Sequence, residues 1–493
     1  MFGMTVIHSN MVISIIITML IAFIAVRWIY FKTLKIAKAK SIVDNPDARK
    51  LQKTPIPVMG GIAVFFGVVV GALVSLTVPF HFFVYNDLLP VVCAMVIMLY
   101  VGAMDDIVGL STHSRLIIEI LTVVGLIYGS GCCIDTFRGL WGIYHFSWWI
   151  GVPLTVLTGV GLINSMNMVD GVNGLSSGLC MLCSSMFGMV FLRSGDMPNA
   201  LLAFAMTASL LPFFIHNVFG LHSRMFIGDA GTMVMGVLMT WFVMCILRDD
   251  TRLTYYAGAK GVNLIALVLA IMSLTVADTL RVMFTRIVKG LNPFRPDKTH
   301  LHHVFITIGV SHSVTTLTEI IIECLIIIIW AISVEMHVSY DGQLYVVIIS
   351  ALVLVWGTYL FLRHHIKRHT NFLHHITHFG IATHMGRKDW WKQISAWLDA
   401  PEWEDEEEER RIRNEYLQMK YGVLNPYERS KAKIRTFLKG KAEVFVTDIR
   451  QHSEADPELV DEILQEALEK DFIRVVRRDK HNEIEIVTLI EKE

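Results

Sequence analysis

The chain has 493 residues, of which 54% are hydrophobic and 18% are charged, and its formal net charge is −1. Soluble proteins carry about 25% charged residues, so the composition excludes an ordinary soluble protein and indicates a polytopic membrane protein. The balanced charge gives no reason to expect a nucleic-acid partner. The seven cysteines are scattered and predict no disulfide framework.

Long apolar runs divide most of the chain into predicted membrane helices. A membrane-spanning helix needs about 17–25 mainly apolar residues. We therefore predict an all-α polytopic membrane protein with about eleven transmembrane helices and a small cytoplasmic α+β domain at the C-terminus. The first run, Met11 to Tyr30, lacks a small-residue cleavage site and is expected to remain as the first span. The spans are expected near 10–31, 58–80, 88–104, 114–132, 147–165, 173–192, 199–217, 230–247, 261–280, 315–333 and 343–362.

The loops between these spans differ in their content of Lys and Arg. One set is rich in them and consists of 32–57, 105–113, 166–172, 218–229 and 281–314. The positive-inside rule places this set in the cytoplasm. The N-terminus is then expected outside and the C-terminal tail inside, and the polar motifs described next all lie on the cytoplasmic face.

The first basic loop reads VDNPDARKLQKTPIPVMGG from Val43. Arg49 and Lys50 could clamp phosphate oxygens, and the Gly60-Gly61 pair permits a backbone to approach a ligand or a neighbouring helix closely. A positive-inside loop followed by a helix-packing glycine pair explains the same residues, so both interpretations stay open.

Two adjacent aspartates, Asp105 and Asp106, end the apolar run that begins near Leu88. An ionised carboxylate beside hydrocarbon is costly and is interpreted as functional by default. Two such groups repel each other and usually need a counter-charge, most simply a divalent cation. The alternative is that the pair only marks the point where a helix leaves the membrane.

The third basic loop reads NSMNMVDGVNGLSSGL from Asn164, and Asn167, Asp170 and Asn173 recur in it every three residues among glycines. Carboxylate and amide oxygens on a short segment suit Mg²⁺. Capping of the adjacent helices is the alternative role for these residues.

The fourth loop ends in RMFIGDAGTMVMG from Arg224. Asp229 stands at the start of a span, where it could cap the helix or ligate a metal ion. Phe226 could stack on a nucleotide base, although an aromatic residue at a membrane edge commonly serves as an anchor.

The last large basic loop, RVMFTRIVKGLNPFRPDKTHLHHVF from Arg281, contains His300, His302 and His303. Zinc binding is not favoured, because no cysteine partners and no HExxH helix accompany the histidines. Histidine and arginine fit better as hydrogen-bond donors to a sugar or a diphosphate.

Five motifs in this order, NPDARK followed by PIPVMGG, MDD, NMVDG, GDAG and PDKTHLHH, resemble those of the polyprenyl-phosphate N-acetylhexosamine-1-phosphate transferase family (glycosyltransferase family 4). The resemblance covers about residues 10–365, and PDKTHLHH is closest to the GlcNAc-using branch. The family usually has an aspartate at the position of Asn173, so recognition of a base by the amide is expected there.

The resemblance implies a role for each motif. Asp229 and Asn167 would hold Mg²⁺, with Mn²⁺ as the alternative ion, and Asp105, Asp106 and Asp170 would be the catalytic acids. The residues expected to bind the substrates are Arg49, Lys50, Asn173, Phe226, Arg295, His300, His302 and His303.

The implied reaction transfers N-acetylglucosamine-1-phosphate from UDP-GlcNAc to undecaprenyl phosphate at the cytoplasmic face of the bacterial inner membrane. UMP is released, and a lipid-linked cell-envelope polysaccharide is begun. The alternatives are a related transferase that uses another UDP-N-acetylhexosamine or UDP-MurNAc-pentapeptide, and, in another class, a lipid-carrier transporter. A transporter predicts polar residues near the membrane mid-plane, whereas these motifs cluster at one face. A homodimer is left open.

The composition changes after the last span. We expect the transferase domain to cover 1–365, charged and amphipathic linker helices to cover 366–430, and a small α+β domain to cover 431–493. A helix at the membrane surface is expected within 364–400. The alternating pattern near the C-terminus predicts a β-hairpin in a winged-helix-like domain, whose expected partner is a cytoplasmic protein.

Overall fold

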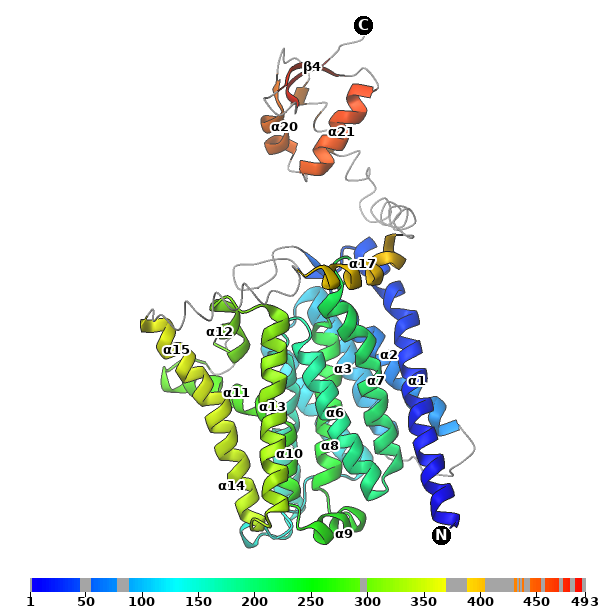
Figure 1. The fold of residues 1–493 in the computed structure, drawn as a ribbon, viewed down its shortest axis with the longest axis vertical. Helices are drawn as coiled ribbons and strands as arrows, with labels where there is room; N and C mark the ends of the chain where they lie inside the picture. The colour runs from blue at the N-terminus through cyan, green and yellow to red at the C-terminus, as the bar shows by residue number, and fades with distance from the viewer. Residues whose placement is uncertain are drawn as a thin grey trace. The chain divides into compact units, whose positions relative to one another are not determined.

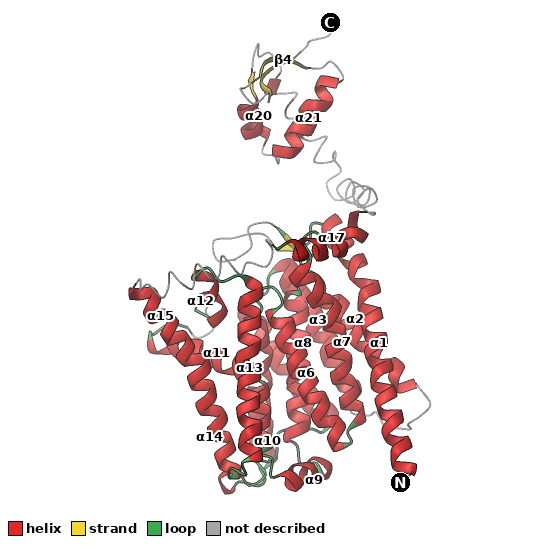
Figure 2. Ribbon diagram, in the orientation of Figure 1, coloured by secondary structure: helices red, strands yellow, loops and turns green. Residues whose placement is uncertain are grey.

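In the computed structural model, the first unit, Met1–Glu404, is a bundle of long helices with shorter helices lying across its ends (Figure 1). Among the described residues, almost all of the regular structure is helical, and strands occur only as short segments (Figure 2). The structure describes residues 2–44, 55–77, 88–292, 299–368 and 388–403, together with 430–431, 434, 437–438, 444–453, 457–469, 473–478 and 484–489.

The helices of the described residues follow one another along the chain. They are α1 (Phe2–Ala39), α2 (Gly60–Thr77), α3 (Leu88–Val108), α4 (Thr112–Ser130), η1 (Leu140–Gly142), α5 (Trp148–Met168), α6 (Leu175–Ser194), α7 (Met197–Phe219), α8 (Gly228–Leu247), α9 (Thr251–Lys260), α10 (Leu264–Ile271), α11 (Ser273–Val288), α12 (Leu301–Thr307), α13 (His312–Glu335), α14 (Tyr340–Ala351), η2 (Leu352–Gly357), α15 (Thr358–Arg368) and α17 (Asp389–Trp403). Strands β1 (Val43–Asp44) and β2 (Ile56–Pro57) pair antiparallel.

Each predicted span coincides with helical structure, so the prediction of an all-α polytopic membrane protein is confirmed. Within the described residues, nine helices are long and apolar enough to cross a membrane, and the bent pair α10 and α11 raises the number to ten. Helix α2 corresponds to the remaining predicted span. Its apolar part, Gly60–Leu73, is shorter than the helices counted above.

Helix α8 occupies the centre of the bundle, and every residue in it except Asp229 is buried. It packs against α2 and α3 through glycines. A Cβ atom added to Gly61 would collide with the backbone of Gly231, and one added to Gly102 would collide with the backbone of Ala230. The close approach allowed by Gly61 is therefore an approach to a neighbouring helix, which decides between the two interpretations of the Gly60-Gly61 pair.

The predicted span 261–280 is formed by two helices with a break between them. Helices α10 and α11 meet at an angle of 77°. The buried Glu323 of α13 stabilises the break, because its carboxylate accepts hydrogen bonds from the backbone N–H of Ser273 (3.1 Å) and of Leu274 (2.7 Å). A side-chain acceptor for the first N–H groups of a helix lets a new helix begin inside the bundle.

The C-terminal residues form a separate unit, Asp405–Glu493. Helices α20 (Val446–Ser453) and α21 (Pro457–Glu469) pack with strands β3 (Val444–Phe445), β4 (Ile473–Arg478) and β5 (Ile484–Leu489), which form an antiparallel sheet in the order β3-β5-β4. The antiparallel pair β4–β5 confirms the predicted hairpin. Of the predicted linker 366–430, only residues 366–368, 388–403 and 430 are among the described residues.

Candidate functional site

Three of the predicted motifs meet where α3 and α5 end and α8 begins. The amide of Asn167, in the last turn of α5, donates hydrogen bonds to Asp229 Oδ1 (2.6 Å) and to Thr232 Oγ1 (2.9 Å). Asp105 and Asp106 lie in the last turn of α3. The side chain of Asp229 is 34% exposed, so the one accessible residue of α8 lies at this meeting point.

Asp106 caps the N-terminus of α8. Its carboxylate accepts hydrogen bonds from the backbone N–H of Asp229 (2.9 Å) and of Ala230 (3.2 Å). A helix N-terminus has unpaired N–H groups and a partial positive charge, so a carboxylate is the favoured partner there. The contact fixes the position of Asp229 relative to α3.

Gly228 is needed for this contact. Its φ of +70° lies in the left-handed region, and an added Cβ atom would collide with the carboxylate of Asp106. We expect Gly228→Ala to lower the activity predicted from the sequence by at least about tenfold, because the cap and Asp229 must both shift. The control is Gly125→Ala, since a Cβ atom at Gly125 would meet no atom within 4 Å. Equal activity of the two variants would contradict this role of Gly228.

Arg115 is the cation at the centre of the site. Its guanidinium lies 3.2 Å from Asp105, 3.9 Å from Asp229 and 3.5 Å from Glu119. We call Asp105, Asp106, Asp229 and Arg115 the acidic cluster. Arg115 was expected from the sequence as the cation near the acid pair, whereas Glu119 was missed, although its i, i+4 spacing from Arg115 at the start of an apolar helix was a detectable signal.

The acidic cluster has the charge and the donor atoms that suit a divalent cation. Asp105 and Asp229 lie on the same guanidinium, 3.2 Å and 3.9 Å from Arg115, so one positive charge faces two carboxylates, which repel each other when both are ionised. Among the described residues, no group of three or more His, Cys, Asp or Glu side chains is arranged to hold a metal ion. Mg²⁺ usually takes one or two carboxylates together with waters and substrate phosphates, so Asp105 and Asp229 fit such an ion.

The loop between α5 and α6 carries the NMVDG motif beside the cluster. Asp170 is exposed, and one of its oxygens accepts a hydrogen bond from the hydroxyl of Ser176 (2.6 Å). Asn173 is held through its backbone, since its N–H donates to His312 Nδ1 (3.3 Å) and its carbonyl accepts from the Thr316 hydroxyl (2.9 Å). Helix α13 therefore fixes the end of this loop.

The three predicted histidines differ in their surroundings. His300 is buried and its Nδ1 lies 2.8 Å from Asp278, which also contacts Arg281 at 2.7 Å. His302 is buried against Gly171, so a Cβ atom on that glycine would lie 2.6 Å from His302 Nε2. His303 is half-buried. Asp278 was missed, although an acid three residues before an arginine at the end of an apolar run was a visible signal.

Burial of His302 predicts a pH-dependent stability. Burial, followed by the neighbouring His303 and His300, lowers the pKa of His302 well below 6.5. The folded state then binds fewer protons than the unfolded state, so its stability is complete above about pH 6.5 and falls as the pH decreases towards the folded pKa. We expect a thermal-unfolding series from pH 7.5 to 5 to show a smaller decrease for His302→Gln than for the wild type. A His145→Gln control should follow the wild type, and identical slopes for all three proteins would contradict the prediction.

Phe226 connects the first loop to the GDAG segment. Its backbone N–H donates to the carbonyl of Pro57 (2.8 Å), and its carbonyl accepts from the N–H of Gly60 (2.9 Å). The PIPVMGG and GDAG segments therefore form one structure, in which the Phe226 side chain is half-buried. Arg49, Lys50 and Arg295 lie outside the described residues.

Comparisons with known proteins agree on one family. Residues 88–247 match the model of glycosyl transferase family 4. The chain is 30% identical over 282 residues to the undecaprenyl-phosphate α-N-acetylglucosaminyl 1-phosphate transferase of Yersinia pestis. The matched residues are 57% of this chain and 73% of that protein. It is similarly 30% identical over 287 residues to the protein of that name in Escherichia coli K12 and 28% identical over 282 residues to that of Salmonella typhi, with 57% and 73% covered in both pairs.

Proposed function

The chain belongs to glycosyl transferase family 4, the polyprenyl-phosphate N-acetylhexosamine-1-phosphate transferases, and from this premise we propose that it transfers N-acetylglucosamine-1-phosphate from UDP-GlcNAc to undecaprenyl phosphate. UMP is the second product. The lipid-linked sugar then begins a cell-envelope polysaccharide.

The observation that carries the proposal is the convergence of Asp105, Asp106, Asn167 and Asp229 around one arginine at the ends of three membrane helices. A soluble nucleotide sugar and a lipid phosphate can meet there, because the motifs lie where helices leave the apolar bundle. The relatives' names support this kind of reaction, since they specify a polyprenyl phosphate acceptor and an N-acetylglucosaminyl 1-phosphate donor group.

Each residue of the site has a role in a phosphoryl transfer between two anions, the diphosphate of the nucleotide sugar and the lipid phosphate. Asp229 and Asp105 would hold Mg²⁺, which neutralises charge on the diphosphate when it is bound. Arg115 keeps Asp105 and Asp229 at fixed positions, and Asn167 fixes the orientation of Asp229. Asp170, exposed beside the cluster, can accept a proton from the lipid phosphate. Positioning and electrostatics supply most of the catalysis in such reactions, so a nucleophilic side chain is not required.

We propose direct transfer. An oxygen of the lipid phosphate forms a bond to the β-phosphorus of the nucleotide sugar. The bond between that phosphorus and the oxygen bridging to the α-phosphate breaks, and UMP leaves with the electron pair. Detection of a phosphorylated aspartate in a single turnover would contradict direct transfer.

The sidedness follows from the distribution of charge. The loops that carry the site hold most of the Lys and Arg residues between spans, so the site is assigned to the cytoplasmic face, with the N-terminus outside and the C-terminal unit in the cytoplasm. We assign the protein to the inner membrane of a bacterium, where undecaprenyl phosphate is the lipid carrier. A cytoplasmic protein is the proposed partner of the C-terminal unit.

A panel of donors tests the substrate. Purified protein would receive undecaprenyl phosphate, Mg²⁺ and either UDP-GlcNAc, UDP-GalNAc, UDP-glucose or UDP-MurNAc-pentapeptide, and the release of UMP would be followed with and without EDTA. We expect UMP from UDP-GlcNAc and none after chelation. Release from another donor alone would overturn the substrate assignment. No release from any donor, by protein shown to be folded, would favour a lipid-carrier transporter.

A further inference from the structure

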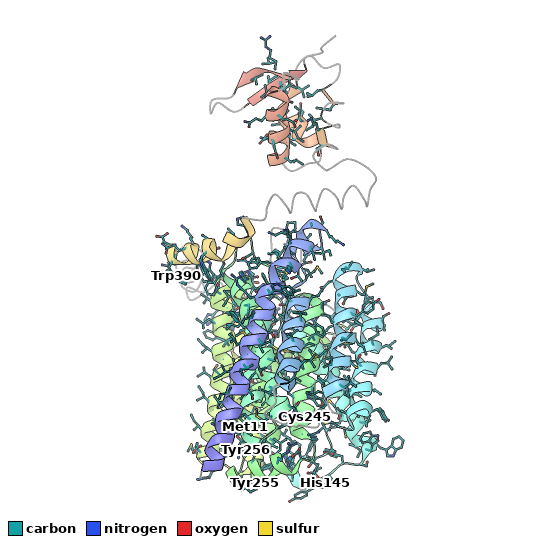
Figure 3. All side chains as sticks on the ribbon, turned by 90° about the vertical axis from the view of Figure 1, so that its right-hand side faces the viewer. Met11, His145, Cys245, Tyr255, Tyr256 and Trp390 are labelled. Atoms are coloured by element: carbon teal, nitrogen blue, oxygen red, sulfur yellow. The ribbon has the colours of Figure 1, made fainter. Side chains whose placement is uncertain are left out.

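Helix α17 lies across one end of the bundle, near α1 and α7 (Figure 1). Trp390, in its first turn, lies at the end of the bundle opposite to His145 and Tyr255 (Figure 3). Trp391 and Leu398 are buried, and the Trp391 ring lies 4.4 Å from that of Phe219 at the end of α7. The helix is thus packed on the bundle by a definite apolar face.

Asp399 on the same face of α17 binds the segment that follows α7. Its Oδ2 accepts hydrogen bonds from the backbone N–H of Leu221 (3.1 Å) and of His222 (3.0 Å). Its Oδ1 accepts from the N–H (2.9 Å) and the hydroxyl (2.6 Å) of Ser223. Three consecutive amides and a hydroxyl therefore converge on one carboxylate that is 2% exposed.

The charge of Asp399 suits this geometry. Burial raises the pKa of the carboxyl, but the hydrogen bonds from Ser223, His222 and Leu221 outweigh burial and hold the pKa below its usual value. The carboxyl is therefore ionised at neutral pH, and hydrogen bonds to an ionised acceptor are the stronger kind.

The segment that Asp399 binds leads directly into the acidic cluster. Residues 221–223 are followed by Met225, whose carbonyl accepts from Asn217, and by Phe226, which pairs with Pro57 and Gly60. Asp229 comes three residues later and is held by Asp106 through its backbone. Every backbone contact in this series fixes the entry to α8, so a displacement at Ser223 is transmitted to Asp229.

The same segment is also held from α1. The Tyr30 hydroxyl donates to the Ser223 carbonyl (2.8 Å), and the Lys38 ammonium donates to the His222 carbonyl (3.0 Å). Helix α1 therefore binds the carbonyl groups and Asp399 binds the amide groups. If the hydrogen bonds to Asp399 are lost, the hydrogen bonds from α1 remain, so the fold can survive while the segment loses its fixed position.

We propose that Asp399 is a positioning residue for the transfer reaction, which holds residues 221–223 and through them the position of Asp229 and Phe226. The assignment rests on the proposed function. It makes α17, which follows the last membrane span, a part of the active-site framework.

The test compares Asp399→Ala with Asp389→Ala in the full-length protein. Asp389 is on the same helix, is 91% exposed in its side chain and pairs with Lys392 at 3.6 Å, so its removal controls for loss of charge from α17. Asp399→Asn retains one acceptor oxygen and should be intermediate. Two measurements are made on each protein: hydrogen–deuterium exchange of peptides covering 221–230, and kcat and KM for UMP release.

We expect Asp399→Ala to accelerate exchange at 221–223 and to lower kcat by about tenfold with a smaller change in KM, because the reacting groups are misplaced rather than lost. Asp389→Ala should match the wild type in both measurements. Unchanged exchange in Asp399→Ala, or faster exchange with unchanged kcat, would overturn the assignment. If the wild type releases no UMP from any donor, the proposed function fails separately, and exchange at 225–230 then decides whether Asp399 fixes the entry to α8.

Discussion

Replacing Asp229 with Asn is expected to lower the rate of UMP release by about two to three orders of magnitude. The asparagine keeps the size of the side chain, and its carbonyl oxygen can still accept the hydrogen bond from Asn167. The backbone N–H that Asp106 binds is unchanged. Only the negative charge that faces Asp105 and Arg115 is removed, so the loss of rate would measure the electrostatic contribution of the site.

The matched control is Asp249→Asn, because Asp249 is an exposed acid beside His145, at the other end of the bundle. That variant should keep the wild-type rate. The two proteins should also unfold at similar temperatures, since neither change removes a packing contact. An active Asp229→Asn protein would place the chemistry elsewhere.

The second large effect is expected for Asp106→Ala. The substitution removes the acceptor of two backbone N–H groups at the start of α8 and should lower the free energy of unfolding by about 1–3 kcal/mol. Transfer should also fall by at least about tenfold, because Asp229 is no longer held against α3. Thermal unfolding and initial rates of UMP release measure the two effects.

Asp196→Ala separates the two effects. Asp196 accepts a hydrogen bond from the N–H of Asn199 (3.4 Å) at the start of α7, at the far end of α6 from the acidic cluster. Its removal should lower stability while leaving the rate per folded molecule unchanged. If Asp106→Ala behaves in the same way, Asp106 is a structural cap and takes no part in the reaction.

The spans were predictable because a membrane helix is defined by local composition. Each predicted apolar run coincides with helical structure, from α1 to the continuous α14, η2 and α15. The meeting of Asp106, Asn167 and Asp229 was foreseeable for a related reason. The Lys and Arg content of the loops predicts that all three residues lie at the same membrane face. Helix ends at one face are close enough for their side chains to make contact.

Contacts between distant segments were not predictable. The break before Ser273 depends on Glu323, fifty residues later, and no local signal in 261–280 indicates it. The link between Asp399 and Ser223 spans 176 residues. The surroundings of His300 and His302 also depend on a distant partner, because Asp278 and Gly171 come from other helices and loops.

The position of the transferred phosphorus tests the central claim most directly. UDP-GlcNAc radiolabelled at its β-phosphate would be incubated with the protein, undecaprenyl phosphate and Mg²⁺, and the lipid and aqueous phases would be counted separately. We predict that the label moves into the lipid phase and that unlabelled UMP remains in water. Label retained in the aqueous phase as UDP, with sugar on the lipid, would show transfer of the sugar alone and contradict the account.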